Sequence, residues 1–332
     1  IRVDTALGPV TLAGGAADRA FGAYAFYGTR YPNQREETRT RSLRLSADLG
    51  IAGGWTLSPS ASVRNHRDDF ILERSDPDFY RNLHETDRTA FRVVARRPLL
   101  GGSLAVGAEA GRDTIDSTNL GDHARARLAA SVELGRPFST ARPSAGGFRA
   151  GVRTDDYDGY GTRVSPQAGA WTALGRGLKA RASVGTAFRI PTFTELYYSD
   201  PQTAGNPDLR PETATTFEAG LTWETGPVTF DAAVFHRHGS DLIDFVRSSP
   251  SEPFRATNIR TVDTLGLEAT LALEPAVLAR TPVTRVALRA AFYSADLEEL
   301  RAEAGATEGR YVLDPLRVKW DLVAEARLPF RV

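Results

Sequence analysis

The side chains that could carry chemistry are few and widely spaced. The segment with Asp155, Asp156 and Asp158 is weakly similar to the beginning of a calcium-binding loop, but the glutamate that closes such a loop is missing. His236 and His238 fall on one face of a strand, and no third metal ligand lies near them in the sequence. We interpret them as two histidines at the outer end of that strand. The sequence therefore supports no cofactor, and calcium bound by loop carboxylates stays without support.

Catalytic motifs are also missing. The chain has no cysteine, which excludes thiol catalysis and cysteine-based zinc or iron–sulfur sites. It contains no Gly-x-Ser-x-Gly, Walker-type or His-Glu-x-x-His motif. We therefore predict a protein that is not an enzyme.

Aromatic side chains in polar segments are the better candidates for ligand binding. Tyr197 and Tyr198, with Phe193 and Tyr80, could bind a flat ligand at little entropic cost, because aromatic rings have few rotatable bonds. The structural alternative is that these rings only pack within their loops.

The segment around Tyr197 contains prolines that cannot donate to a strand ladder. Pro191, Pro207 and Pro211 therefore predict that the chain leaves the sheet here. We expect turn hydrogen bonds at Asn206 and Pro207, and an ion pair between Arg210 and Glu212, to hold the segment down.

The elements that position these residues alternate with period two. Leu178, Ala180, Ala182 and Val184 are interleaved with Lys179 and other polar or small residues, as expected of a long strand. About fifteen segments of this kind run along the chain. Short Gly-containing turns at 52–54, 100–102, 175–177 and 225–227 alternate with polar loops at 28–39, 70–88, 191–211 and 243–261.

This alternation of connections favours an up-and-down meander with tight turns at one rim and long loops at the other. The fold prediction is all-β, an antiparallel up-and-down transmembrane β-barrel. The alternative is a soluble sandwich whose apolar faces point inward.

Composition agrees with this prediction. The 332 residues carry 41 Lys and Arg against 41 Asp and Glu, so no basic nucleic-acid-binding module is indicated. Mean hydropathy is −0.30, and no apolar run approaches the ~20 residues of a helical membrane span. The chain has no Met and starts at Ile1, so we expect 1–332 to be one partial barrel domain of a longer protein.

One run of motifs resembles the TonB-dependent outer-membrane receptors. It consists of an aromatic-Arg-x-Pro-Thr-aromatic sequence at 188–193, a Gly-Asn-Pro-x-Leu-Arg-Pro-Glu sequence at 205–212, and an aromatic-Glu-x-Gly sequence at 217–220. The segments at 27–32 and 68–82 look most similar to the cobalamin-receptor-like members, and a weaker match lies at 314–317. The residues that carry the loop and rim motif are Arg189, Pro191, Asn206, Pro207, Leu209, Pro211 and Glu212.

The resemblance implies an outer-membrane receptor that binds a scarce, bulky nutrient such as cobalamin or an iron siderophore and imports it with TonB-supplied energy. About fifteen of roughly 22 strands would be present, without the plug domain and the TonB-contacting region of the full-length chain. The implied partners are the nutrient, that plug, the TonB complex and outer-membrane lipid, with no nucleic acid. The segment 191–211 would be an extracellular loop. Rivals are a passive porin-like barrel without a plug and an outer-membrane barrel enzyme.

In such a barrel the polar strand face lines the lumen. The charged residues expected there are Arg125, Arg127, Glu133, Lys179, Arg181, Arg285, Arg289, Asp321 and Glu325.

Overall fold

The computed structural model describes residues 1–24, 31–274, 282–295, 308–310 and 317–326. Motif residues 27–30 and 314–316 lie outside these ranges. Within them the chain is nearly all β, as predicted. The strands are β1 (Arg2–Thr5), β2 (Gly8–Gly22), β3 (Arg35–Ala47), β4 (Leu49–Ile51), β5 (Trp55–Ile71), β6 (Arg81–Leu99), β7 (Gly102–Ser117), β8 (His123–Pro137), β9 (Gly146–Tyr157), β10 (Gly161–Gly175), β11 (Leu178–Arg189), β12 (Ser199–Asp200), β13 (Thr203–Ala204), β14 (Glu212–Thr225), β15 (Val228–Arg247), β16 (Phe254–Leu273), β17 (Val283–Ala295), β18 (Glu308–Gly309) and β19 (Val318–Ala326).

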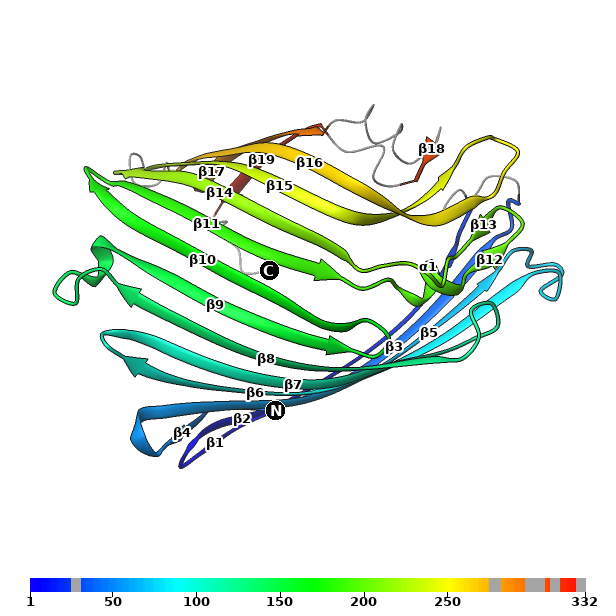
Figure 1. The fold of residues 1–332 in the computed structure, drawn as a ribbon, viewed down its shortest axis with the longest axis horizontal. Coiled ribbons are helices and arrows are strands. Elements are labelled where there is room, and N and C mark those ends of the chain that lie inside the picture. Colours follow the sequence, from blue (N-terminus) through cyan, green and yellow to red (C-terminus); the bar gives the residue numbers. More distant parts are fainter. Residues whose placement is uncertain (25–30, 275–281, 296–307, 311–316, 327–332) are drawn as a thin grey trace.

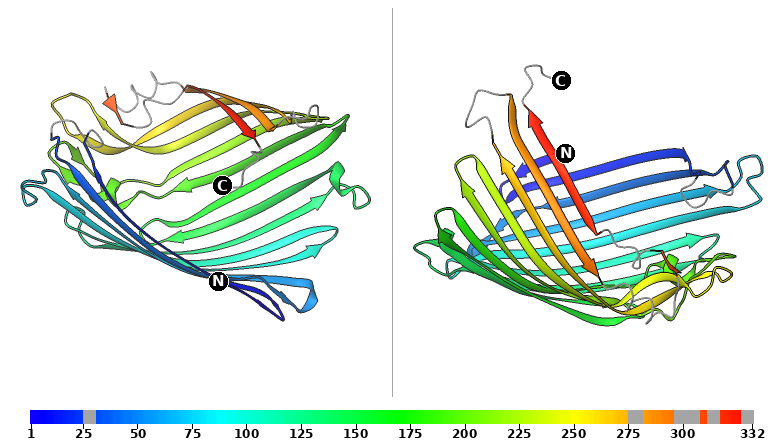
Figure 2. Two further views of the ribbon diagram at one scale, coloured as in Figure 1. Left: turned by 180° about the vertical axis from the view of Figure 1, so that it is seen from behind. Right: turned by 90° about the horizontal axis from the view of Figure 1, so that it is seen from above.

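Each long strand pairs antiparallel with the next long strand along the chain, so the sheet is a meander. The described strands form a curved, open wall (Figure 1), with β1 and β2 toward one edge and β19 at the other. The view from above in Figure 2 shows the curvature. Within the described residues no helix combines the length and hydropathy needed to cross a membrane.

The register divides the side chains between two faces. Leu178, Ala180 and Val184 of β11 stand opposite Trp223, Leu221 and Phe217 of β14. Large apolar side chains of this face stay uncovered: Leu128 is 63% exposed and Phe217 54% exposed. An apolar face that none of the described residues covers is the expected outer surface of a membrane barrel. We call it the outward face and the opposite one the polar face.

The strands end in two different kinds of connection. At one end, the turn rim, two-residue turns join β6 to β7 at Leu100–Gly101 and β10 to β11 at Arg176–Gly177, and all four residues have positive φ. Such turns match the strand twist. A Cβ on Gly177 would lie 1.9 Å from the Glu224 carbonyl oxygen, so only glycine fits there.

The other end, the loop rim, has shorter loops than the sequence predicted. β5 continues to Ile71 and β6 begins at Arg81, while β15 continues to Arg247 and β16 begins at Phe254. The predicted loops at 70–88 and 243–261 are therefore largely strand. These strands run 17 to 20 residues, against the ~10 that cross a bilayer. The hydropathy pattern did not reveal that these strands extend beyond the bilayer, because above the lipid both strand faces are polar while the backbone ladder continues.

The division into tight turns at one rim and long loops at the other also has exceptions. The connection at 138–145 on the turn rim has eight residues, and the one at 158–160 on the loop rim has three.

A charge placed on the outward face should destabilise the barrel, because a guanidinium in hydrocarbon loses its hydration. We expect Val184→Arg in the full-length protein to lower the free energy of unfolding by about 2–4 kcal/mol. Ser183→Arg is the matched control, since Ser183 stands opposite Glu218 on the polar face. Urea unfolding in lipid vesicles measures both. Equal losses in the two variants would contradict the face assignment.

Candidate functional site

The segment between β11 and β14 forms the centre of the loop rim. It contains the short helix α1 (Phe193–Tyr197) and the small strands β12 and β13. Thr192 caps α1: its hydroxyl accepts from the Glu195 N–H at 3.2 Å, and the Glu195 carboxylate accepts from the Thr192 N–H at 2.7 Å. This reciprocal capping box satisfies two helix-start donors and fixes where the helix begins.

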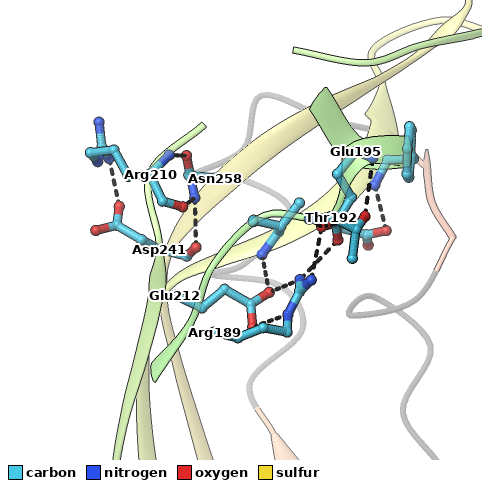
Figure 3. A network of polar contacts seen from close by, with 10 residues as sticks. Arg189, Thr192, Glu195, Arg210, Glu212, Asp241 and Asn258 are labelled. Atoms are coloured by element: carbon cyan, nitrogen blue, oxygen red, sulfur yellow. Dashed lines mark hydrogen bonds and ion pairs between the residues drawn. The ribbon is translucent and has the colours of Figure 1, made fainter. Parts of the chain in front are cut away.

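Arg189 joins both ends of the segment through two carboxylates (Figure 3). Its guanidinium donates to Glu195 at 2.8 Å and to Glu212, its cross-strand neighbour, at 2.5 Å. Each carboxylate is only 14% exposed, whereas Arg189 is 41% exposed. The Ile243 N–H also donates to Glu212 at 2.7 Å. One arginine thus holds a helix and two strands in place.

The predicted ion pair between Arg210 and Glu212 is wrong. Arg210 instead pairs with Asp241 at 2.5 Å (Figure 3), because the strand register places Arg189 directly opposite Glu212. Asn258 completes the Arg210 contact by accepting from its N–H and donating to its carbonyl oxygen, both at 2.9 Å.

The predicted turn at Asn206 is confirmed. Its side-chain oxygen accepts from the Asp208 N–H at 3.0 Å, and its amide donates to the Ala256 carbonyl at 3.2 Å. Beneath it lies a small apolar core of Leu196, Leu209, Ile243, Phe245 and Ala256. The segment is therefore packed down onto the β15–β16 hairpin, and Pro191, less than 2% exposed, closes its start.

We call the segment 191–211 together with the apolar core beneath it the platform. The four aromatic residues predicted to bind ligand lie in two groups at this platform. The Tyr197 ring stacks on the ring of His123, with 3.6 Å between centroids, and Phe193 lies against Arg125 at 4.9 Å. The Tyr80 and Tyr198 hydroxyls meet at 3.4 Å, although 118 residues separate them.

The electrostatics of the site fix two protonation states. Burial, the hydrogen bond with Tyr80 and the charge of Asp200 raise the pKa of the Tyr198 hydroxyl, so it stays protonated. Burial also works to raise the pKa of Glu195, but hydrogen bonds from Arg189 and Thr192 outweigh it, and that pKa lies below its ordinary value.

A pocket of about 460 Å³ opens beside the first aromatic group. Arg125 and Arg163 line it, and the Nε atom of each is buried without a hydrogen-bond partner in the described part of the chain. His123 and Tyr160 also line it, as do the acidic residues Asp158 and Asp208. Sequence reasoning missed His123, Tyr160 and Arg163, because they come from separate strands and turns that only the sheet brings together.

All nine charged residues predicted to line the lumen lie on the polar face, since each alternates with outward apolar residues in the register. Many are paired there. Arg127 contacts Glu109, and Arg181 donates to both oxygens of Asp231 at 2.7 and 2.9 Å. Opposite charges on the polar face thus neutralise one another in several cross-strand contacts.

The other sequence candidates have different partners. His236 and His238 both contact the Asp263 carboxylate, at 3.1 and 2.9 Å. Asp155 pairs with Arg153 at 2.6 Å, and Asp158 accepts from the Ala126 N–H at 2.9 Å. Among the described residues, no group of three or more potential ligands is arranged to hold a metal ion.

Removing the Arg189 guanidinium should loosen the segment 191–211, because two shielded carboxylates would lose their shared cation. We expect Arg189→Ala to speed amide hydrogen exchange in 192–211 by about tenfold or more, with the barrel still folded. Arg210→Ala is the control, because its ion pair is exposed and worth little. Unchanged exchange in Arg189→Ala would show that the apolar core alone holds the segment.

Acid should loosen the same segment. The lowered pKa of Glu195 means that its stabilising effect is complete above the ordinary value of 4.5 and is lost as the pH falls through the lowered one. Exchange in 192–198, corrected for its intrinsic pH dependence, should therefore be constant at neutral pH and accelerate below pH 4.5. Glu195→Gln should abolish this dependence. A dependence that persists in that variant would assign it to another group.

Known proteins share this architecture. The family model described as "TonB dependent receptor-like, beta-barrel" matches residues 3–318. Vitamin B12 transporter BtuB of Photobacterium profundum is 30% identical over 190 residues, covering 56% of this chain and 30% of that protein. The iron-regulated outer membrane virulence protein of Vibrio cholerae is 26% identical over 208 residues, covering 56% and 32%. The chain thus spans about a third of the length of these curated relatives.

Solved structures show the same fold. The siderophore receptor PirA from Pseudomonas aeruginosa superposes with a TM-score of 0.71 at 16% identity, over 88% of this chain and 54% of that one. A variant of the ferric enterobactin receptor PfeA from the same organism, in complex with enterobactin, gives 0.70 at 14% identity over 88% and 50%. Since the family model covers almost the whole chain, the chain belongs to the TonB-dependent receptor family and forms part of an outer-membrane β-barrel wall.

Proposed function

We propose that this chain is the barrel part of a receptor that binds a bulky nutrient, cobalamin-like or a ferric siderophore, and imports it with TonB-supplied energy. Family membership supports the general role, and the names of the relatives, a vitamin B12 transporter and siderophore receptors, support the two nutrient classes.

The observation that carries the proposal is the aromatic and cationic cluster on the loop rim. Phe193 and Tyr197 stand beside the pocket together with Arg125 and Arg163, whose Nε donors lack partners within the described residues. A large ligand with polar edges could stack on the rings and accept from the arginines. Because the platform is fixed by Arg189 and the apolar core, little ordering entropy would be lost on binding.

The orientation of the barrel follows from the same proposal. The loop rim would face the outside and the turn rim the periplasm, so that the nutrient meets Tyr80, Tyr197 and Tyr198 first. The paired charges of the polar face would then line the lumen and contact, through water and ion pairs, the plug of the full-length chain. TonB would act through a region N-terminal to the barrel.

Truncating the aromatic anchors should weaken binding. In the full-length receptor displayed on cells, we expect Tyr197→Ala and Tyr198→Ala each to lower the affinity for the transported nutrient by about tenfold or more, since a packed anchor contributes about 2 kcal/mol. Binding and uptake of cobalamin and of a ferric siderophore are measured in parallel. Phe138→Ala is the control, because Phe138 is 62% exposed at the turn rim.

The outcomes separate the rival functions. Normal surface levels with unchanged affinity in both variants would make the tyrosines structural. Uptake that persists without TonB would favour a porin-like barrel, and turnover of a lipid or peptide by the purified protein would favour an enzyme.

A further inference from the structure

Three arginines line the pocket beside the first aromatic group, and two of them are already used by the protein itself. Arg210 pairs with Asp241 at 2.5 Å, so its charge is balanced. Arg125 donates from Nη1 to the Pro191 carbonyl oxygen at 2.8 Å, and its guanidinium carbon lies 4.9 Å from the centre of the Phe193 ring. Both side chains therefore hold the platform in place.

The third arginine, Arg163, is free. Its guanidinium forms no hydrogen bond or ion pair with any residue that the structure describes, and its Nε atom is buried. It stands on the polar face of β10, directly opposite Asp155 of β9. That carboxylate is already taken, because Arg153 donates to both of its oxygens, at 2.8 and 2.6 Å. A half-buried guanidinium without an acceptor is costly, and an anion in the pocket would supply the acceptor.

Tyr160 offers a second donor to the same pocket. It lies in the short connection between β9 and β10, where its N–H donates to the Tyr157 carbonyl oxygen at 3.0 Å. Its hydroxyl has no hydrogen-bond partner in the described part of the chain. Burial raises the pKa of this hydroxyl, so it stays protonated and able to donate. The pocket thus presents one guanidinium and one hydroxyl to an acceptor on a ligand.

Acidic side chains limit how much negative charge the pocket can accept. Asp158 and Asp208 line it together with the arginines, and Asp158 is held in place by the Ala126 N–H at 2.9 Å. Since Arg210 is balanced by its own partner, these two carboxylates offset the charges of the other two arginines. A ligand with several negative charges would be repelled by them, whereas a single anionic group can reach Arg163.

We propose that the pocket receives one anionic oxygen group of the nutrient, a carboxylate or a phosphodiester, at Arg163 and Tyr160, with a flat part of the nutrient against the Tyr197 ring. The planar guanidinium forms two parallel hydrogen bonds with such a group. The substrate class that fits this lining is a monoanion, and a polyanion such as a ferric tris-catecholate does not fit it. The inference rests on the proposed function, because it names the chemistry of the nutrient bound at the same site.

The test uses small aromatic probes in place of the nutrient. Benzoate and benzamide share one shape and differ in charge, and isophthalate carries a second carboxylate. Their affinities for the purified full-length receptor in detergent are measured by ligand-observed NMR titration. We expect benzoate to bind roughly tenfold more tightly than benzamide, because its hydrogen bonds with a guanidinium are charge-assisted. Isophthalate should bind no more tightly than benzoate.

Three variants assign this preference to one guanidinium. Arg163→Gln should abolish the preference for benzoate, while continued binding of benzamide shows that the pocket is intact. Arg163→Lys should keep part of the preference, because lysine retains the charge but not the planar fork. Arg136→Gln is the control, since Arg136 is exposed at the turn-rim end of β8 and its removal should leave the affinities for all probes unchanged.

The inference is overturned if the unmodified receptor does not prefer benzoate, if the preference survives in Arg163→Gln, or if isophthalate binds more tightly than benzoate. Nutrient binding by cells is a separate measurement. Cells that bind a nutrient while the probes show no preference would overturn the inference and leave the proposed function standing. Cells that bind neither cobalamin nor a ferric siderophore would overturn the proposed function, and the probes would still decide the anion site.

Discussion

The structure depends on one constraint: within hydrocarbon every backbone N–H and C=O must pair inside the protein. A continuous antiparallel ladder meets this demand from β2 to β19. The ladder then forces side chains to alternate, so each strand presents one face to lipid and one to water. Tight turns follow as well, because consecutive strands are neighbours, and they require the left-handed backbone that Gly101 and Gly177 supply.

The same ladder, carried beyond the lipid, builds the candidate site. Above the bilayer the strands lose their apolar pattern but keep their register, and register places Arg189 opposite Glu212. Arg189 also donates to Glu195, and Glu195 forms with Thr192 the capping box that fixes the start of α1. The aromatic cluster is therefore mounted on an extension of the barrel wall, which makes the loop rim a preorganised surface.

The two faces of the wall are separated by single residues. Arg112 points to the outward face, while its neighbour Asp113 lies on the polar face and pairs with Arg88 at 3.1 Å. A shift of one residue would exchange the side chains of the outward face and those of the polar face. The charges of the two faces are thus kept apart by register alone.

The sequence by itself determined the fold class, the strand faces and the proline-bounded segment, because period-two alternation, turn glycines and prolines act locally. It placed Lys179 and Arg181 on the strand face opposite Leu178 and Ala180, and it located the turn at Asn206. Tertiary structure decided the partners: Arg189 rather than Arg210 meets Glu212, and Tyr80 meets Tyr198 across 118 residues. It also decided that residues such as 81–88 extend a strand. These outcomes depend on cross-strand register and on the curvature of the sheet, which no local pattern encodes, since polar strands above the lipid and polar loops have the same composition.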